Sequence, residues 1–462
     1  MGENKITTDK YDVVIIGSGM GAMGAASMLT SAGYKTLVLE KYARLGGRFS
    51  TVEYKGYKMP TGAIGIETGG AVEKIFKELK VPFDVQPEPR LFYWIDGKTY
   101  EMPGRGGIRA LLDILAKTSG ERAKIVGRIG KEVAGAKIMG AFKSGLESAD
   151  KLGQTMSFRD WLLQYTDNED VLAVFRCVIF AMYSLSDAEI PAKTFFHFVS
   201  KGLGGGYRVY GHARKGNLSM VEGLYGAVKE RGNDVWKNAD VKKILVKDGK
   251  ATGVLVHLKE ENKEIEIQAR AVISNAGCKK TALMAGRENL TEKYLKEVDG
   301  LHPCPIVTVY AGADRPFTEV PGMVNTVGCR NLYQFAPVTN TCPDTARPGK
   351  HLLVTFGGPP SSLYPMNARL ETEKHLKDLS DVLPGFEDWA ELLRTDTRNI
   401  DDEWPVYHSW AGYDLPHETP IPNLFNVGDS TKPSGMVGLP ASAQTGINAA
   451  NLVKKIVKPS KA

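Results

Sequence analysis

The most constraining feature of the sequence is a glycine-rich turn between an apolar run and a stretch of small residues. Residues 11–16 (YDVVII) are apolar and β-branched, which predicts a buried strand. Residues 22–32 predict a helix that ends at Gly33, and residues 35–40 (KTLVLE) predict a second strand. A strand, a turn, a helix and a second strand within about 30 residues form a parallel β-α-β unit, which requires a sheet covered by helices.

The turn has the spacing Gly17-x-Gly19-x-x-Ala22. The first glycine allows a tight turn, the second lets the backbone approach a diphosphate, and the small third residue lets the helix pack closely on the strand. The helix N-terminus adds N–H groups and a positive dipole end. Glu40 ends the second strand 23 residues after Gly17, where a carboxylate can accept hydrogen bonds from an adenosine ribose. The unit therefore predicts a dinucleotide site.

Two other segments indicate the same kind of site. Residues 44–48 (RLGGR) can offer backbone N–H groups and a guanidinium to a diphosphate, although an ordinary glycine turn with two surface arginines is the alternative. Near the other end of the chain, a strand at 424–427 is followed by Gly428-Asp429 and a small-residue helix at 441–457. This arrangement can hold a polyol, or it is simply another strand–helix unit. Similar strands near both termini predict one domain assembled from separated segments.

The amino-acid composition argues against several classes of protein. The chain has 42% hydrophobic and 24% charged residues, which is typical of a globular protein, and its net charge of +6 is too small for a nucleic-acid partner. The five cysteines form no C-x-x-C pair and the eight histidines no close pair, so no metal site is expected. The first ten residues carry charges and lack the apolar core of a secretory signal, so we expect a cytoplasmic protein.

The rest of the chain predicts a mixture of helices and strands. Residues 158–199 are rich in apolar and aromatic side chains and predict a helical cap, and the glycine cluster at 202–206 predicts a mobile loop. A hairpin is expected at 240–257, with its turn at Asp248-Gly249. Further helices are expected at 73–80, 108–117, 220–231 and 371–382, and further strands at 271–274, 306–310 and 352–356.

These blocks resemble those of a family of FAD-dependent oxidoreductases, the group of phytoene desaturases, carotenoid isomerases and flavin amine oxidases. The resemblance rests on the unit from Gly17 to Glu40, on RLGGR, on the hairpin VKKILVKDGKATGVLV, on AVISNAG and on the C-terminal NLFNVGD and TGINAA. Their order and spacing extend over nearly the whole chain. The middle segment 184–198 (SLSDAEIPAKTFFHF) is more similar to the desaturase branch.

The resemblance implies an α/β fold with a discontinuous Rossmann-like FAD-binding domain of the glutathione-reductase type and a second, α+β substrate domain. The FAD-binding domain would take residues 1–75, 216–290 and 401–462. The substrate domain would take 76–215, with the helical cap, and 291–400. FAD is expected to be non-covalent, because no cysteine follows Cys342 to attach a flavin at the C-terminal turn.

The resemblance also implies a set of cofactor contacts. Glu40 would bind the ribose, Arg48 the diphosphate, Val241 the adenine through its backbone, Asp429 the ribitol, and the N–H groups of residues 436–437 the flavin carbonyl. The full set is Gly17, Ser18, Gly19, Met20, Gly21, Glu40, Lys41, Gly47, Arg48, Gly62, Ala63, Val241, Gly428, Asp429, Met436 and Val437.

One position departs from the family pattern. Gly62 and Ala63 would lie near the flavin ring, but Thr61 stands before them where the family usually has a carboxylate. An acid–base role is therefore not transferred to this loop.

The implied activity is hydride transfer between FAD and a C–H or C=C unit of an apolar small molecule, which means desaturation, saturation or double-bond isomerisation. Amine oxidation and a non-catalytic flavin-bearing binding protein are the alternatives. The catalytic candidates are Tyr407 and His408, in an aromatic cluster with Trp404 and Trp410 that could also be a core patch.

Two expectations concern partners. No second nucleotide motif is convincing, so the electron donor or acceptor is expected to be external. The segment 195–215 interleaves aromatic residues with lysines and arginines, which suits peripheral contact with the inner face of a membrane. A substrate-gating lid is the favoured alternative.

Overall fold

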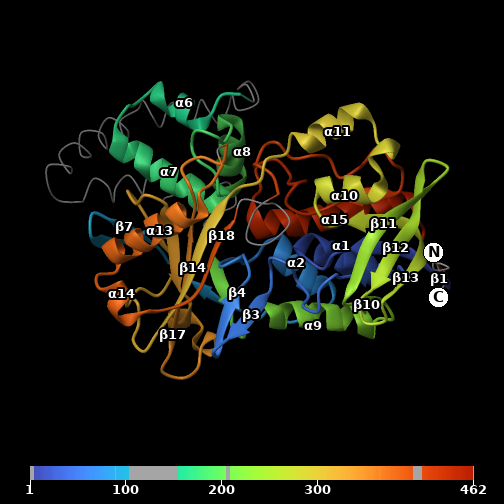
Figure 1. Ribbon diagram of the computed structural model, residues 1–462, viewed down its shortest axis with the longest axis horizontal. Helices are drawn as coiled ribbons and strands as arrows, with labels where there is room; N and C mark the ends of the chain where they lie inside the picture. The colour runs from blue at the N-terminus through green and yellow to red at the C-terminus, as the bar shows by residue number, and fades with distance from the viewer. Residues whose placement is uncertain are drawn as a thin grey trace.

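The computed structural model describes residues 5–88, 90–102, 155–203, 209–363, 365–398 and 408–460. Figure 1 shows two lobes side by side, each built around its own β-sheet, with the first and last described helices together in one lobe. The predicted helix at 108–117, the glycine loop from residue 204 onward, and the candidate Tyr407 lie outside the described residues. The fold is mixed α/β, as predicted.

The first lobe contains a seven-stranded sheet in the order β10-β2-β1-β13-β12-β11, with β19 paired to β13. Its strands are β1 (Lys5–Ile16), β2 (Thr36–Leu39), β10 (Asp234–Trp236), β11 (Ala239–Lys247), β12 (Lys250–Leu258), β13 (Lys263–Ser274) and β19 (Leu424–Asn426). β1 runs parallel to both β2 and β13, and β19 runs parallel to β13. The carboxyl ends of strands from both ends of the chain therefore meet at one edge.

The predicted local elements of this lobe are confirmed. The hairpin β11–β12 turns at Asp248 and Gly249, which both have positive φ, of 49° and 72°. The strand predicted at 271–274 is the end of the longer β13, whose first half pairs antiparallel with β12. The strand predicted at 11–16 likewise extends back to Lys5.

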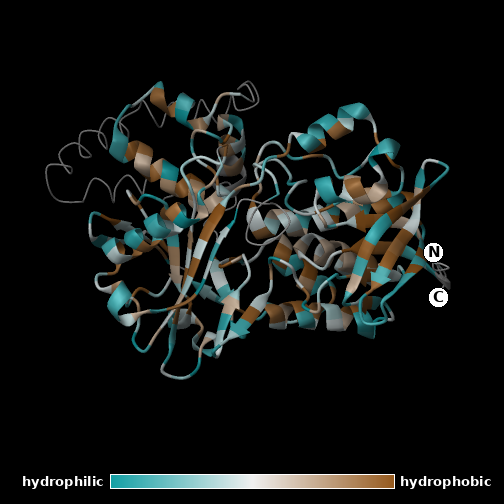
Figure 2. Ribbon diagram, viewed as in Figure 1, coloured by the Kyte–Doolittle hydropathy of each residue, from teal (hydrophilic) through white to brown (hydrophobic). Residues whose placement is uncertain are grey.

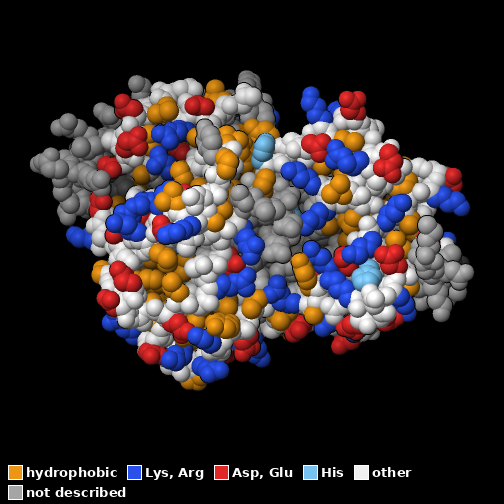
Figure 3. Space-filling view, viewed as in Figure 1, with side chains coloured by type: hydrophobic (Ala, Val, Ile, Leu, Met, Phe, Trp, Pro, Cys, Tyr) orange, Lys and Arg blue, Asp and Glu red, His pale blue; other side chains and the backbone are white. Residues whose placement is uncertain are grey.

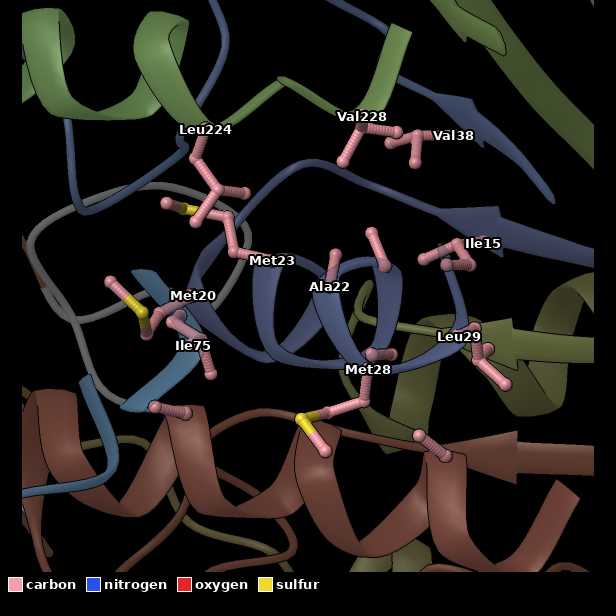
Figure 4. Close-up of a cluster of buried hydrophobic side chains, with 14 of the residues drawn as sticks. Ile15, Met20, Ala22, Met23, Met28, Leu29, Val38, Ile75, Leu224 and Val228 are labelled. Carbon is pink, nitrogen blue, oxygen red and sulfur yellow. The ribbon is translucent and has the colours of Figure 1, made fainter. Parts of the chain in front are cut away.

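Four helices pack on this sheet and on each other: α1 (Met20–Ser31), α2 (Ala71–Glu78), α9 (Asn217–Glu230) and α15 (Gly438–Ile456). Figure 4 shows side chains of α1 between α9 and α15, with Met23 toward Leu224 and Met28 toward α15. α1 and α15 approach so closely that a Cβ at Gly446 would lie 2.0 Å from the Gly21 carbonyl oxygen. The first and last helices therefore pack backbone to backbone, which only small residues allow.

Helix α2 crosses the domain boundary predicted at residue 75. Ile75 and Phe76 are both fully buried in the core cluster that α1 and α15 share. The predicted domain boundary thus lies within one helix, and the chain as far as Leu79 packs in the core of the first lobe.

The second lobe contains a seven-stranded sheet in the order β18-β14-β17-β16-β15-β7-β8. Its strands are β7 (Leu91–Ile95), β8 (Lys98–Met102), β14 (Ile306–Ala313), β15 (Val324–Thr326), β16 (Leu332–Pro337), β17 (His351–Gly357) and β18 (Glu391–Arg398). β14 has every residue buried and confirms the strand predicted at 306–310, while β17 confirms the one at 352–356. The central strands of both sheets carry long hydrophobic stretches (Figure 2).

Two smaller sheets connect the lobes. One is the hairpin of β3 (Thr51–Tyr54) and β4 (Tyr57–Pro60), and the other joins β5 (Ile66–Glu67), β6 (Val85–Glu88) and β9 (Tyr210–Ala213).

Three helices form the predicted cap on the second lobe: α6 (Phe158–Leu163), α7 (Glu169–Tyr183) and α8 (Ala192–Leu203). Phe195, Phe196 and Phe198 of α8 are buried, and the rings of Phe195 and Phe196 pack around Phe158. These three aromatic side chains therefore do not face a membrane, contrary to the interpretation of segment 195–215 as a contact surface, because packing in the helical core removes them from the surface.

The other α-helices of the described residues are α10 (Cys278–Ala285) and α11 (Glu292–Asp299) over the first sheet, and α12 (Val338–Thr341), α13 (Ala368–Val382) and α14 (Phe386–Trp389) in the second lobe. α13 and α9 confirm the helices predicted at 371–382 and 220–231, each beginning three residues earlier. Among the described helices, none combines the length and apolar character needed to cross a bilayer.

Candidate active site

A cleft of about 870 Å³ opens at the carboxyl ends of β1 and β2, which is where α/β sheets bind ligands. Its lining comes from both lobes: the turn after β1, the loop 39–49, Gly62 and Ala63, the start of β11, α10, the start of α15, and Phe356 and Arg394 of the second sheet. Lys and Arg side chains lie along the boundary between the two lobes (Figure 3). The cleft thus joins the N-terminal and C-terminal motifs that the sequence predicts.

Glycines of both motifs converge on one side chain, that of Asn275. A Cβ at Gly19 would lie 2.5 Å from Asn275 Nδ2, and a Cβ at Gly21 or Gly428 would lie 2.6 or 2.7 Å from Asn275 Oδ1. Gly17 and Gly428 also have positive φ, of 85° and 102°. Both turns therefore need glycine, because any side chain would collide with Asn275 or strain the backbone.

Asn275 was missed as a site residue by the sequence interpretation. It directly follows β13, whose backbone pairs with β1, and its N–H donates to the Ile16 carbonyl oxygen at 2.8 Å. A polar residue at the end of a buried strand parallel to the first was the available signal.

Glu40 connects the first turn to the loop that follows. Glu40 Oε2 accepts hydrogen bonds from Ser18 N at 3.0 Å and Ser18 Oγ at 2.5 Å, and Oε1 accepts from Tyr42 N at 3.0 Å. Ser18 Oγ in turn accepts from Gly46 N at 2.9 Å. The buried carboxylate therefore lines the cleft and fixes both glycine loops around it.

Arg48 and Asp429 form a bidentate ion pair between the two ends of the chain. Arg48 Nη1 lies 2.7 Å from Asp429 Oδ2, and Nη2 lies 2.8 Å from Oδ1. Burial alone would raise the pKa of Asp429, but the charges of Arg48, His408 and Lys432 hold it well below the usual range. Asp429 is therefore ionised at neutral pH and joins the RLGGR loop to the turn after β19.

His408 lies beside the same carboxylate. Its backbone N–H donates to Asp429 Oδ2 at 2.8 Å, and its Nε2 lies 3.8 Å from Asp429 Oδ1. Its ring also lies against Gly277, where a Cβ would come within 3.2 Å of Nδ1. His408 lines the cleft, whereas Trp410 is buried in the helical core of the second lobe. The predicted aromatic cluster thus divides between the site and the core.

Lys432 connects the segment that contains His408 to the turn that contains Asp429. Its buried Nζ lies 2.7 Å from Asp414 Oδ1, donates to the Ser409 hydroxyl oxygen at 3.0 Å, and donates to the Asp429 carbonyl oxygen. The lysine therefore fastens the segment after His408 to the turn that carries Asp429.

Thr61, the departure from the family pattern, has a structural role. Its hydroxyl donates to the Gly47 carbonyl oxygen at 2.8 Å and accepts from Ser50 N at 3.0 Å. Ala63 N donates to the Arg48 carbonyl oxygen at 3.2 Å. A deprotonated carboxylate could not donate to Gly47, so threonine suits this fully buried position.

Most predicted cofactor residues line the cleft together, with two exceptions. The lining residues among them are Gly17, Ser18, Gly19, Met20, Gly21, Glu40, Lys41, Gly47, Arg48, Gly62, Ala63, Val241, Gly428 and Asp429. At the C-terminal helix, the lining comes from Gly438, Leu439 and Ser442 instead of Met436 and Val437. Val437 is the N-cap of α15, so its position at the helix start agrees with the prediction.

Positive charge exceeds negative charge along the described lining. The cations are Lys41, Arg44, Arg48, Lys242, Lys280 and Arg394, and the carboxylates are Glu40, Asp240 and Asp429. Burial, and then the charge of Arg394, lower the pKa of Arg44, whose Nε is buried without a partner among the described residues. Such an excess fits the diphosphate of a dinucleotide. The glycine cradle, the N-terminus of α1 and this charge together fit FAD.

Comparison with known proteins agrees with the site. The family model of flavin-containing amine oxidoreductases matches residues 23–454. An uncharacterized protein of Methanocaldococcus jannaschii is 24% identical over 460 residues, covering 96% of this chain and 99% of that protein. The all-trans-retinol 13,14-reductase of Homo sapiens is 26% identical over 308 residues, which cover 58% of this chain and 48% of the human protein.

A solved structure shows the same fold. The oxidoreductase from Methanosarcina mazei has a TM-score of 0.77 and 24% identity, covering 96% of this chain and all of that one.

Proposed function

The chain belongs to the family of flavin-containing amine oxidoreductases, and we propose that within it this protein transfers hydride between FAD and a C–H or C=C unit of an apolar substrate. The protein is an FAD-dependent oxidoreductase that acts on a small molecule. The proposal that the reacting bond is C–H or C=C, and not a C–N bond of an amine, rests on the side of the cleft that the second sheet forms.

The lining residues on this side of the cleft support the proposal. The described lining residues from the second sheet are Phe356 and Arg394, an aromatic ring and a cation. The lining carboxylates Glu40, Asp240 and Asp429 all come from the first lobe. A substrate ammonium would find no carboxylate among the described lining residues of this side, where the Arg394 guanidinium is itself paired with Asp396, whereas an apolar chain can pack on Phe356. The matched human relative is named for reduction of retinol, which agrees with an apolar substrate.

We assign the cofactor residues as follows. The N-terminus of α1 and Gly17–Gly21 take the diphosphate, and Glu40 takes the adenosine ribose. Val241 takes the adenine through its backbone. The turn at Asp429 and the start of α15 take the ribitol and the ring, with Gly62 and Ala63 on the other side.

FAD is proposed to bind without a covalent bond. The five cysteines are buried or half-buried, and burial raises the pKa of each thiol, to about 12 for Cys278, Cys329 and Cys342. Thiols with such pKa values are not nucleophilic thiolates at neutral pH.

When bound, FAD supplies a ring that accepts or gives a hydride. The protein's own tasks are to align the substrate, exclude water and move a proton. We propose His408 as the proton carrier, because its imidazole lines the cleft and an imidazole ring has one nitrogen that can donate a proton and one that can accept it. Asp429 orients it through the backbone N–H bond and the nearby carboxylate oxygen. Tyr407, the second candidate, lies outside the described residues.

Amine oxidation is the second candidate function, because the matching family model is named for it. Anaerobic spectroscopy of the flavin separates the two. The oxidised holoenzyme, and the same enzyme after photoreduction, are each mixed with apolar alkenes such as retinol and with amines such as putrescine. We expect the alkenes to reoxidise the photoreduced flavin if the enzyme saturates double bonds. If it forms double bonds, the saturated counterparts should bleach the oxidised flavin. Bleaching by amines alone would reject the proposal, and FAD-depleted protein serves as the control.

A further inference from the structure

We propose that helix α10 forms the wall of the cleft on which the adenine of FAD packs, with Leu283 as the contacting side chain. This inference rests on the proposed assignment of Val241 to the adenine and adds an apolar contact from a second element. The contact would strengthen binding of the adenosine half of FAD and leave binding of the flavin half unaffected.

The start of β11 lies beside the carboxylate that is assigned to the adenosine ribose. Ala239 N donates to the Glu40 carbonyl oxygen at 2.9 Å, and Asn238 N donates to the Tyr42 carbonyl oxygen at 3.2 Å. Glu40, Ala239 and Val241 all line the cleft. This part of the cleft is therefore its adenosine end.

Helix α10 extends from the ribitol end of the cleft to this adenosine end. Its first residue is Cys278, whose Sγ lies 3.2 Å from Ser430 Oγ, next to the turn at Asp429. Met284 lies about 9 Å further along the helix and packs on the apolar cluster that contains Val241. The helix also packs against β11 (Figure 1). The second half of α10 is therefore the part that borders the adenosine end.

Leu283 is the exposed apolar side chain of this part of the helix. It lines the cleft and is 65% exposed, whereas Ala239 and Val241 of β11 are 1% and 8% exposed. Lys280, Leu283 and Met284 are spaced three and four residues apart, so they share one face of α10, and all three line the cleft. Leu283 therefore presents apolar area that a ligand in the cleft can cover.

Adenine is the part of FAD that suits such a side chain at this end of the cleft. The ribose and the diphosphate are polar and need hydrogen-bond donors, acceptors and positive charge. The adenine ring has flat faces that pack on apolar side chains and an edge of nitrogen atoms that bonds backbone groups. The Leu283 side chain on α10 and the Val241 backbone on β11 supply these two kinds of contact.

FAD dissociation from diluted holoenzyme, followed by flavin fluorescence, tests the proposal. Leu283→Ala removes most of the apolar contact and should raise the Kd for FAD about 3- to 10-fold. Leu283→Met keeps an apolar side chain of similar size and should bind FAD as the wild type does. Leu370→Ala is the matched control, because Leu370 is a 44% exposed leucine of α13 in the second lobe, and it should leave the Kd unchanged.

Competition with ADP distinguishes this contact from a structural role of Leu283. ADP contains the adenosine and the diphosphate but no flavin, so it should displace FAD from the wild-type protein. Leu283→Ala should weaken ADP binding by the same factor as FAD binding. Because the replaced side chain is mostly exposed, the FAD-saturated variants should keep the far-ultraviolet circular dichroism of the wild type.

Four results would overturn the proposal: an unchanged Kd for FAD in Leu283→Ala, an equal rise in Leu370→Ala, no displacement of FAD by ADP, or weaker FAD binding without weaker ADP binding. The last would place Leu283 against the flavin half of the cofactor. No readout involves a substrate, so bleaching of the flavin by amines alone would reject the proposed reaction and leave the adenine contact standing.

Discussion

Replacing Gly21 by alanine should weaken both the fold and FAD binding. The added Cβ would lie 2.6 Å from Asn275 Oδ1, 2.9 Å from Gly428 N and 3.1 Å from Val427 Cγ2. Gly428 N is fixed by its bond to Thr445 Oγ1 at 2.8 Å. Helix α1 cannot retreat either, because a Cβ at its Gly24 would already lie 2.6 Å from the Ala443 carbonyl oxygen of α15.

The expected cost follows from these contacts. Overpacking of a tight site destabilises by about 1–3 kcal/mol. Alanine regains about 1 kcal/mol of helix propensity over glycine, which leaves a net loss of up to about 2 kcal/mol for the protein without cofactor. Because the displaced groups, Asn275 and Gly428, line the cleft, we also expect FAD to bind at least about tenfold more weakly.

Urea unfolding with and without excess FAD measures both effects. At FAD concentrations far above Kd, a tenfold rise in Kd removes about 1.4 kcal/mol of ligand-linked stability. Gly226→Ala is the matched control, since it lies inside α9 with no atom within 4 Å of its added Cβ. That variant should gain up to about 1 kcal/mol and keep full FAD binding. If Gly21→Ala is as stable as the control and retains FAD equally, the packing argument is wrong.

Four further predictions concern single residues. Glu40→Gln replaces one carboxylate oxygen by an NH2 donor, so the side chain can no longer accept both the Ser18 and the Tyr42 bonds. It should weaken FAD retention by about 1.5–3 kcal/mol, measured as FAD lost on dilution; full retention would count against the assignment. Asp429→Ala removes the bidentate partner of the half-buried Arg48 and should also release FAD, so unchanged FAD occupancy would refute the role of Asp429. His408→Gln should slow anaerobic flavin reduction or reoxidation by about 10²–10⁴, and only a few-fold effect would exclude it as the proton carrier. Burial lowers the pKa of His375 from 6.5 to about 4. Between these two pH values the imidazole is protonated in the unfolded chain and neutral in the folded protein. Stability should therefore fall by about 3 kcal/mol as pH drops from 6.5 to 4 in urea unfolding, and His375→Gln should flatten this slope.

Local structure was predictable from the sequence because it depends on local signals. The apolar run, the glycine turn and the small-residue helix after it define the unit from β1 to β2, and the structure confirms it. Helix ends were less accurate. α15 begins at Gly438, three residues before the predicted start, since Pro440 fits the first turn of a helix, where no backbone donor is needed.

Contacts between distant segments were not predictable in the same way. The sequence interpretation gave Arg48 to a diphosphate and Asp429 to a ribitol, whereas the structure pairs the two side chains across 381 residues. Asn275 and Arg394 line the cleft through the register of their strands. Asn275 lies in the AVISNAG segment, but that segment does not indicate by itself that two glycine turns meet at this side chain, and no local motif marks Arg394. Such placements depend on how the separated segments assemble.

The account depends most directly on FAD occupying the cleft without a covalent bond. Acid precipitation of the native protein, followed by absorbance and mass analysis of the supernatant, measures this in one step. The account predicts a yellow supernatant with the mass of FAD and a colourless pellet. Colour that stays with the pellet would contradict the non-covalent claim, and a colourless native protein that gains no thermal stability from added FAD would contradict the site itself.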